Sequence, residues 1–343
     1  MSGNNNPEWV SLTHEEPVDP QRRIIDPHHH FWGADDCHDL GHAYPHEQLL
    51  EEMGGHNVVG SIYIECDAAW HADGPEHLRP VGETVSVAAQ AKRTENSRAP
   101  IMGIVGYADL KLGNRVQDVL DAHAEVGNGL FKGTRLASVK TADVVGLTFD
   151  QIVARIRSRP VFTDPAFRDG IKCLGRNGYS MDAFIISYQL PLLAELARDL
   201  PDMIFIANHI GAPMFNAASA TDGDRQAVMA NWRESVRTMT PCPNIFVKVG
   251  GLGMEAMFGL NWSKQPKPPT SDDILALWGD DLRFLIDTIG PARCMFESNF
   301  PVDRHAAGYT VLWNAFQKLA ASYSEAEQED LFSGTAKRAY RIS

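Results

Sequence analysis

Short apolar runs recur along the chain, and segments with helical periodicity separate most of them. The runs are rich in β-branched and aromatic residues and end at Gly, Pro, Asn or Asp, as buried strands do. Strands that alternate with helices favour a parallel sheet, because each helix carries the chain back to the edge where the next strand begins. The predicted strands span 23–29, 58–66, 101–110, 129–136, 179–186, 203–209, 244–251 and 293–299.

Helical segments are predicted after each of these strands. Asp164 stands before Pro165 as a predicted N-cap, and Ser324 and Glu327 have the spacing of a capping box. The segment that Ser324 opens, 324–332, is an additional helix, which we expect to pack across the barrel. The other helices are predicted over 48–55, 82–95, 115–126, 164–178, 190–200, 225–239, 272–290 and 307–322.

Eight strand-and-helix units predict a single-domain α/β fold, a (β/α)8 TIM barrel. Residues 1–22 are read as a polar N-terminal extension, and residues 23–343 as the barrel with its C-terminal helix. An open, doubly wound sheet is the alternative. Against it, no GxGxxG or GxxxxGK[ST] motif follows the first predicted strand.

Long connections follow four of the predicted strands, at the end of the barrel where active sites are built. We expect them to cover a bound substrate; the alternative is that they are neutral surface insertions. The last contains QPKPP at 265–269, which favours an extended segment over a helix. The connections are 67–81, 137–163, 210–224 and 252–271.

Composition narrows the class of protein. Hydrophobic residues make up 44% and charged residues 22% of the chain, as in a globular enzyme. The formal net charge of -13 disfavours broad contact with nucleic acid or anionic lipid, since phosphates would be repelled. Five scattered cysteines without a CxxC pair, no apolar leader and no long apolar run predict reduced thiols, a cytoplasmic location and no membrane contact.

The densest chemical signal is the sequence from Asp26 to Trp32, DPHHHFW, at the end of the first predicted strand. Side chains alternate along a strand, so His28 and His30 should share one face while His29 points away. Two imidazoles on one face can bind a divalent cation or orient a substrate carbonyl without one. His209 ends the sixth predicted strand and should add a third ring at the barrel mouth.

IIDPHHHFW, NHIGAP, NIFVKVGGLGM and RCMFESNFPVD resemble the amidohydrolase-related family. The resemblance covers nearly the whole chain and is strongest to the lactonase branch, which includes 2-pyrone-4,6-dicarboxylate lactonase, L-fuconolactonase and 4-sulfomuconolactone hydrolase. It implies a distorted (β/α)8 barrel that hydrolyses lactones or related esters and amides. It also implies that His28, His30 and His209 are catalytic and either bind one metal ion, Zn or Mn, or form a metal-free site.

The strand-eight position, often Asp in this family, is Asn299 in this chain. A neutral amide neither accepts a proton from water nor binds a metal as well as a carboxylate does. We therefore expect a histidine or Asp303 to act as the base, and any metal to bind more weakly. Glu297 should face inward beneath Asn299, where it is either a further candidate base or, the interpretation that we favour, the partner of a Lys or Arg on a neighbouring strand.

Four further polar residues lie at or near predicted strand ends, Glu65, Arg135, Asp182 and Lys248. Arg135 and Lys248 suit a substrate carboxylate or sulfonate, and all four are candidate substrate-binding residues. The alternative is that the four pair with one another inside the barrel, because buried charges require partners.

These features predict a hydrolase that opens a small lactone or similar cyclic ester, with a polar or anionic substrate. One alternative keeps the fold and makes the protein a non-oxidative decarboxylase or a hydratase of an unsaturated or aromatic acid. Another, motivated by Asn299, is a degenerate barrel that only binds a ligand or partner. A homo-oligomer is compatible with the sequence, although no segment identifies an interface.

Overall fold

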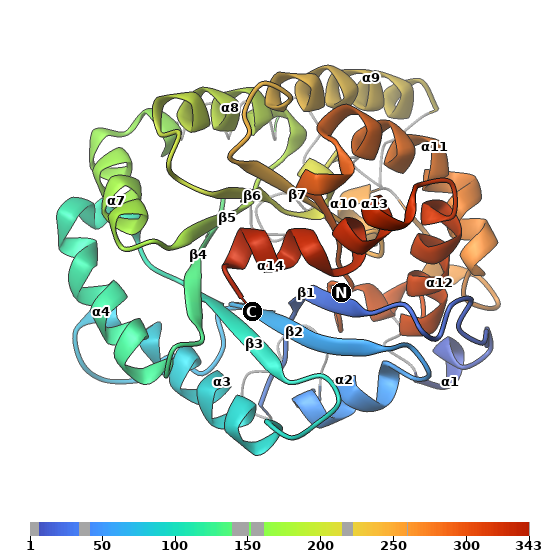
Figure 1. Ribbon diagram of the computed structural model, residues 1–343, viewed down its shortest axis with the longest axis horizontal. Helices are drawn as coiled ribbons and strands as arrows, with labels where there is room; N and C mark the ends of the chain where they lie inside the picture. The colour runs from blue at the N-terminus through green and yellow to red at the C-terminus, as the bar shows by residue number, and fades with distance from the viewer. Residues whose placement is uncertain are drawn as a thin grey trace.

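The computed structural model of the protein describes residues 7–33, 42–138, 151, 161–214, 222–258 and 260–342. Eight parallel strands form one sheet in chain order, surrounded by helices (Figure 1). The sheet closes just beyond β8, where the amide of His30 donates to the Phe300 carbonyl over 2.7 Å. The (β/α)8 barrel is therefore confirmed, and the open-sheet alternative is wrong. The strands are β1 (Ile24–His29), β2 (Val58–Ile64), β3 (Ile101–Gly106), β4 (Phe131–Ala137), β5 (Ser180–Phe184), β6 (Phe205–Ala207), β7 (Ile245–Val249) and β8 (Cys294–Phe296).

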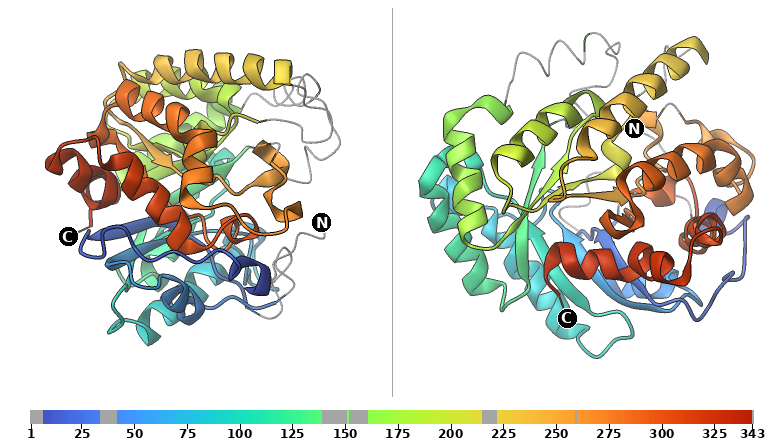
Figure 2. Two further views of the ribbon diagram at one scale, coloured as in Figure 1. Left: turned by 90° about the vertical axis from the view of Figure 1, so that its right-hand side faces the viewer. Right: turned by 45° about the horizontal axis from the view of Figure 1, so that its top comes forward.

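The helices pack around the outside of the strands (Figure 2). Asp164 caps α7 as predicted, since its Oδ1 accepts hydrogen bonds from the amides of Ala166 and Phe167. The capping box of Ser324 and Glu327 also forms, at the start of α13. The helices are α1 (Pro7–Val10), α2 (His46–Glu52), α3 (Val81–Arg93), α4 (Val116–Val126), α7 (Pro165–Arg176), α8 (Leu190–Asp199), α9 (Asp222–Met239), α10 (Glu255–Phe258), α11 (Ser271–Ile289), α12 (Tyr309–Ala320), α13 (Glu325–Glu329) and α14 (Thr335–Tyr340).

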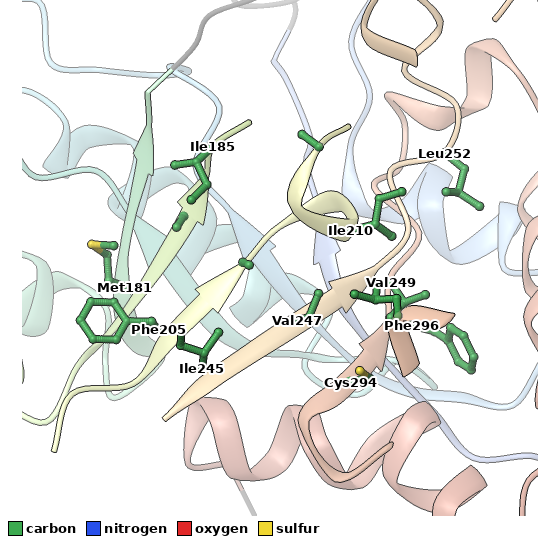
Figure 3. Close-up of a cluster of buried hydrophobic side chains, with 14 of the residues drawn as sticks. Met181, Ile185, Phe205, Ile210, Ile245, Val247, Val249, Leu252, Cys294 and Phe296 are labelled. Carbon is green, nitrogen blue, oxygen red and sulfur yellow. The ribbon is translucent and has the colours of Figure 1, made fainter. Parts of the chain in front are cut away.

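Alternation along the strands separates an outer core from the barrel interior. On β7, Ile245, Val247 and Val249 belong to the core between strands and helices, part of which Figure 3 shows. Phe246 packs against the inner cluster instead, and Lys248, two residues further on, is fully buried. Polar side chains of this second parity can therefore reach the axis of the barrel.

The C-terminal helix α14 closes the end of the barrel at which the strands begin (Figure 1). A single turn of π-helix, Asp330–Gly334, joins it to α13, so the segment predicted over 324–332 continues and packs across the barrel as expected. Within the described residues, α14 therefore covers the end of the barrel where the strands begin. The inner cluster contains Ile25, Ile62, Ile64, Val105, Ile206 and Met295 from the strands, with Ala336, Ala339 and Tyr340 from α14.

The structure describes only part of the long connections that were predicted after four of the strands. Most of 137–163 and part of 210–224 lie outside the described residues, whereas 252–271 contains α10 and a 3-10 turn at Trp262–Lys264. Cys37 also lies outside the described residues; the four cysteines within them are free, as predicted. No helix in the described part of the chain is long and apolar enough to cross a membrane.

Candidate active site

The end of β1 brings His28 and His30 together inside the barrel. Their Nε2 atoms lie 3.2 Å apart, and the His30 Nδ1 lies 2.8 Å from the Ile64 carbonyl oxygen at the end of β2. His29 points outward, where its Nε2 lies 3.0 Å from the Ser61 hydroxyl. The strand parity predicted from the sequence is confirmed for these three rings.

Asp26, two residues before His28 on β1, accepts hydrogen bonds that hold this part of the strand in place. Its Oδ1 accepts hydrogen bonds from the amides of His28 and Ser298, and its Oδ2 accepts one from the Tyr309 hydroxyl over 3.0 Å. Full burial raises the pKa of Asp26 to about 6, although these hydrogen bonds lower it. The carboxyl thereby ties β1 to the segment beyond β8, which fixes the position of His28.

His209 follows β6 on a tight turn in which its φ is 53°. Its ring lies beside His28, with ring centroids 4.6 Å apart. A side chain at Gly251 would not fit, because a Cβ there would lie 2.4 Å from the His209 Nδ1. The loop after β7 therefore packs directly against the ring and holds it toward His28.

Glu297 connects the histidines, and this corrects the sequence interpretation. We expected it to pair with a Lys or Arg, but its Oε1 lies 2.8 Å from the His209 Nδ1 and its Oε2 lies 2.7 Å from the His28 Nδ1. Oε1 also accepts a hydrogen bond from the His209 amide over 3.0 Å. The inward parity shared with Asn299 was the available signal, but it did not identify the partner.

Lys248 and Asp182 lie deeper in the barrel, where Lys248 contacts both Asp182 and His28. The ammonium of Lys248 is 2.8 Å from the Asp182 Oδ1 and 3.1 Å from the His28 Nδ1. Asp182 also accepts hydrogen bonds from the Asn208 side chain and the Tyr340 hydroxyl. Both charged residues are fully buried. The sequence offered substrate binding or mutual pairing for them, and in the structure they pair.

Glu65 and Arg135 form a second ion pair at the ends of β2 and β4. The Arg135 Nε donates to the Glu65 Oε1 over 2.6 Å, and a second guanidinium nitrogen donates to the Glu65 carbonyl. Coulombic attraction to Glu65 raises the pKa of Arg135 against the opposing effect of burial. The guanidinium is thus a fixed positive charge near the histidines.

Asn299 and Asp303 are held together beyond β8. The Asn299 amide nitrogen donates to the Asp303 Oδ1 over 2.7 Å, and the Asn299 side chain also interacts with His30. Burial raises the pKa of Asp303 well above its ordinary value, and its Oδ2 has no hydrogen-bond partner among the described residues. Asn299 therefore links Asp303 to His30 in the histidine cluster.

The electrostatics favour neutral rings at His28 and His30. Burial lowers the pKa of His28 well below its ordinary value, and the nearby charge of Lys248 lowers it further. Burial and the charge of Arg135 act in the same direction on His30. A neutral ring keeps one nitrogen lone pair, which can bind a metal ion or accept a proton.

Within the described residues, potential ligand atoms of His28, His209 and Glu297 all lie within 4.8 Å of one another. His30 adjoins this group through His28. The structure therefore brings together all three predicted histidines and adds Glu297 to them.

The chain was compared with known proteins by sequence. It is 29% identical over 336 residues to an uncharacterized protein, y4mH, of Sinorhizobium fredii, which covers 93% of this chain and 98% of that protein. It is 26% identical over 282 residues to an L-fucono-1,5-lactonase of Burkholderia multivorans, covering 78% of this chain and 83% of the lactonase.

Solved structures share the fold. A Burkholderia multivorans amidohydrolase crystallised with bound zinc has a TM-score of 0.70 at 24% identity, over 93% of this chain and 99% of that one. A 5-carboxyvanillate decarboxylase of Novosphingobium aromaticivorans with manganese has a TM-score of 0.57 at 12% identity, over 94% of this chain and 97% of that one. The family model described as amidohydrolase matches residues 25–342. The chain therefore belongs to the amidohydrolase family.

Proposed function

We propose that the protein hydrolyses a small polar or anionic lactone in the cytoplasm, at the end of the barrel where the strands finish. The observation that carries this proposal is the convergence of His28, His30 and His209, with Glu297 in contact with His28 and His209. The relative named L-fucono-1,5-lactonase supports a cyclic sugar ester as the substrate class. Membership of the amidohydrolase family supports water as the attacking group.

The donor atoms fit a single divalent cation. The Nε2 atoms of His28 and His30 are 3.2 Å apart, and two nitrogens on one tetrahedral zinc ion lie roughly 3.3 Å apart. His28, His30 and His209 would hold the ion, and ligand atoms of His28, His209 and Glu297 lie within 4.8 Å of one another. A bound Zn²⁺ or Mn²⁺ would polarise the ester carbonyl and lower the pKa of water toward neutrality.

The remaining steps fall to the side chains of the chain itself. Arg135, held by Glu65, would attract and orient a substrate carboxylate or carbonyl oxygen. Glu297 keeps the His209 ring in place through two hydrogen bonds. Asp303, whose raised pKa favours the protonated form, would supply the proton that the ring oxygen needs when it leaves, and the proton released by the attacking water would restore it.

The test incubates the protein with a panel of 1,4- and 1,5-sugar lactones and measures the released acid with a pH indicator. We expect His30→Ala to lower kcat/KM by roughly 10²–10³-fold, the usual cost of losing a group that stabilises the developing oxyanion. His29→Gln is the matched control, because His29 faces away from the site. If no lactone is opened, or His30→Ala keeps full activity, the proposal is wrong.

Non-oxidative decarboxylation of an aromatic acid is the second candidate, favoured by Asn299. Such a reaction has less need of a carboxylate that activates water at this position. Incubation with hydroxybenzoic acids and detection of CO₂ separates it from lactonase activity. Ligand binding without turnover in both assays would instead support a binding protein.

A further inference from the structure

Two groups approach the same nitrogen of His28. The Lys248 Nζ lies 3.1 Å from Nδ1 with hydrogen-bond geometry. The Glu297 Oε2 lies 2.7 Å from the same atom, yet it makes no well-directed hydrogen bond among the described residues. An ammonium can only donate and a carboxylate can only accept, so the two partners demand opposite roles of Nδ1.

The hydrogen bonds of His30 indicate whether the Nδ1 of His28 donates or accepts. A carbonyl only accepts, so the His30 Nδ1 must donate to Ile64 O, which leaves its Nε2 as an acceptor. The contact between the two Nε2 atoms then requires the proton of His28 to lie on Nε2. The Nδ1 of His28 is consequently free to accept from Lys248, with one proton on each ring, and the approach of the Glu297 Oε2 to the same Nδ1 is then not a hydrogen bond.

Lys248 is fixed in this position from below. Asp182 is 2.8 Å from its ammonium and is itself held by the Tyr340 hydroxyl, which lies 2.9 Å from Oδ1 and 3.0 Å from Oδ2. The Tyr340 ring also lies under the ammonium, 5.4 Å from Nζ to the centroid. A chain of contacts therefore runs from helix α14, at the closed end of the barrel, to a histidine at the open end.

We infer that Lys248 is a positioning residue that competes with Glu297 for the Nδ1 of His28 and so weakens metal binding at His28 and His30. With Lys248 as partner, His28 presents an N–H group toward His30. With Glu297 as partner, the proton moves to Nδ1 and His28 presents a lone pair, which a cation requires. The positive charge of Lys248 opposes a cation in the same direction.

This inference rests on the proposed function only in taking His28 and His30 as the metal-binding pair. Asp182, Tyr340 and Lys248 thereby set how readily the site is filled, from a buried layer beneath the histidines. The departure at Asn299 acts in the same direction, since it also weakens binding of a cation.

The first test measures Zn²⁺ affinity by competition with a chromophoric chelator. Lys248→Met should bind Zn²⁺ about tenfold or more tightly than the wild type, the size of effect that partners of metal ligands usually have. Lys132→Met is the control, since Lys132 lies on β4 and its ammonium donates to Gly129 O. If Lys248→Met fails to fold, Asp182→Asn combined with Lys248→Met removes both buried charges. Equal or weaker affinity in the folded variant overturns the inference.

The second test reads the histidine directly and needs no activity. In metal-free protein with ¹⁵N-labelled histidine, assigned with His28→Gln, the nitrogen shifts should place the His28 proton on Nε2. In Lys248→Met the proton should move to Nδ1. A wild-type proton on Nδ1 overturns the inference. If these shifts behave as expected and no lactone is opened, the proposed function fails and the role of Lys248 stands.

Discussion

At the scale of single residues, the site depends on which inward positions carry polar groups. Strand parity and the HxH spacing were enough to predict His28 and His30 on one face, and the position of His209 at the end of the sixth predicted strand placed it at the mouth. The partners of Glu297 could not be predicted, because barrel closure decides which side chains from distant strands meet at the axis. Asp26 belongs to the DPHHHFW motif, but its hydrogen bonds with Ser298 and Tyr309 could not be predicted, because they likewise join β1 to the segment beyond β8.

Glu297→Gln should reduce metal affinity or kcat/KM by about 10–100-fold, because an amide has one oxygen and cannot accept from His209 and also from His28 when a cation binds. Circular dichroism should show an unchanged fold. Glu83→Gln is the matched control: this carboxyl is equally buried, has a pKa raised to about 8 by burial, and binds the Tyr63 hydroxyl on the outer face of β2. Comparable losses in both variants would mean that burial, and not contact with the histidines, accounts for the effect.

At the scale of elements, local signals predicted most helices to within a few residues. Asp164 and Ser324 mark helix starts because capping is a local interaction. The course of the chain after Glu329 was harder to predict, since the π-turn and α14 form by packing against the inner cluster of the barrel. In 252–271, α10 was missed because a helix of four residues has little periodicity to detect.

Asp164→Ala should lower the free energy of unfolding by about 1 kcal/mol, since two amides at the start of α7 lose their acceptor. Urea denaturation measures the change. Asp169→Ala, in the same helix but at an exposed position paired with Lys172, should change stability much less. If the two variants lose equal stability, the cap has no special role.

At the scale of the whole molecule, stability depends on histidines buried outside the site. Burial lowers the pKa of His46, His56 and His123 from 6.5 to about 4. His123 is bonded as a neutral ring, with its Nδ1 at the Thr84 hydroxyl and its Nε2 at the Tyr107 carbonyl. Because these buried rings resist protonation in the folded state, their contribution to the free energy of unfolding is complete above pH 6.5. It is lost as the pH falls toward 4.

We therefore expect the stability advantage of the wild type over His123→Gln to shrink by about 2 kcal/mol between pH 7 and pH 5. The difference between the two proteins isolates this ring from Asp26 and Glu83, whose raised pKa values act in the opposite direction. Urea unfolding at pH 7, 6 and 5 measures it. His14→Gln, at a position whose side chain is 80% exposed, should show no such trend. A constant difference for His123→Gln would contradict the expectation.

The seam between β1 and the segment after β8 also bears on how the protein folds. Asp26 and Ser298, which brace His28, are 272 residues apart in the chain. Contacts of such separation carry the largest loop-closure entropy and form late. The helices and the central strand pairs can assemble from neighbouring segments before the two ends of the sheet meet. A partly folded chain would therefore have most of its secondary structure while His28 still lacks its neighbours, and catalytic competence would arise only in the final stage of folding.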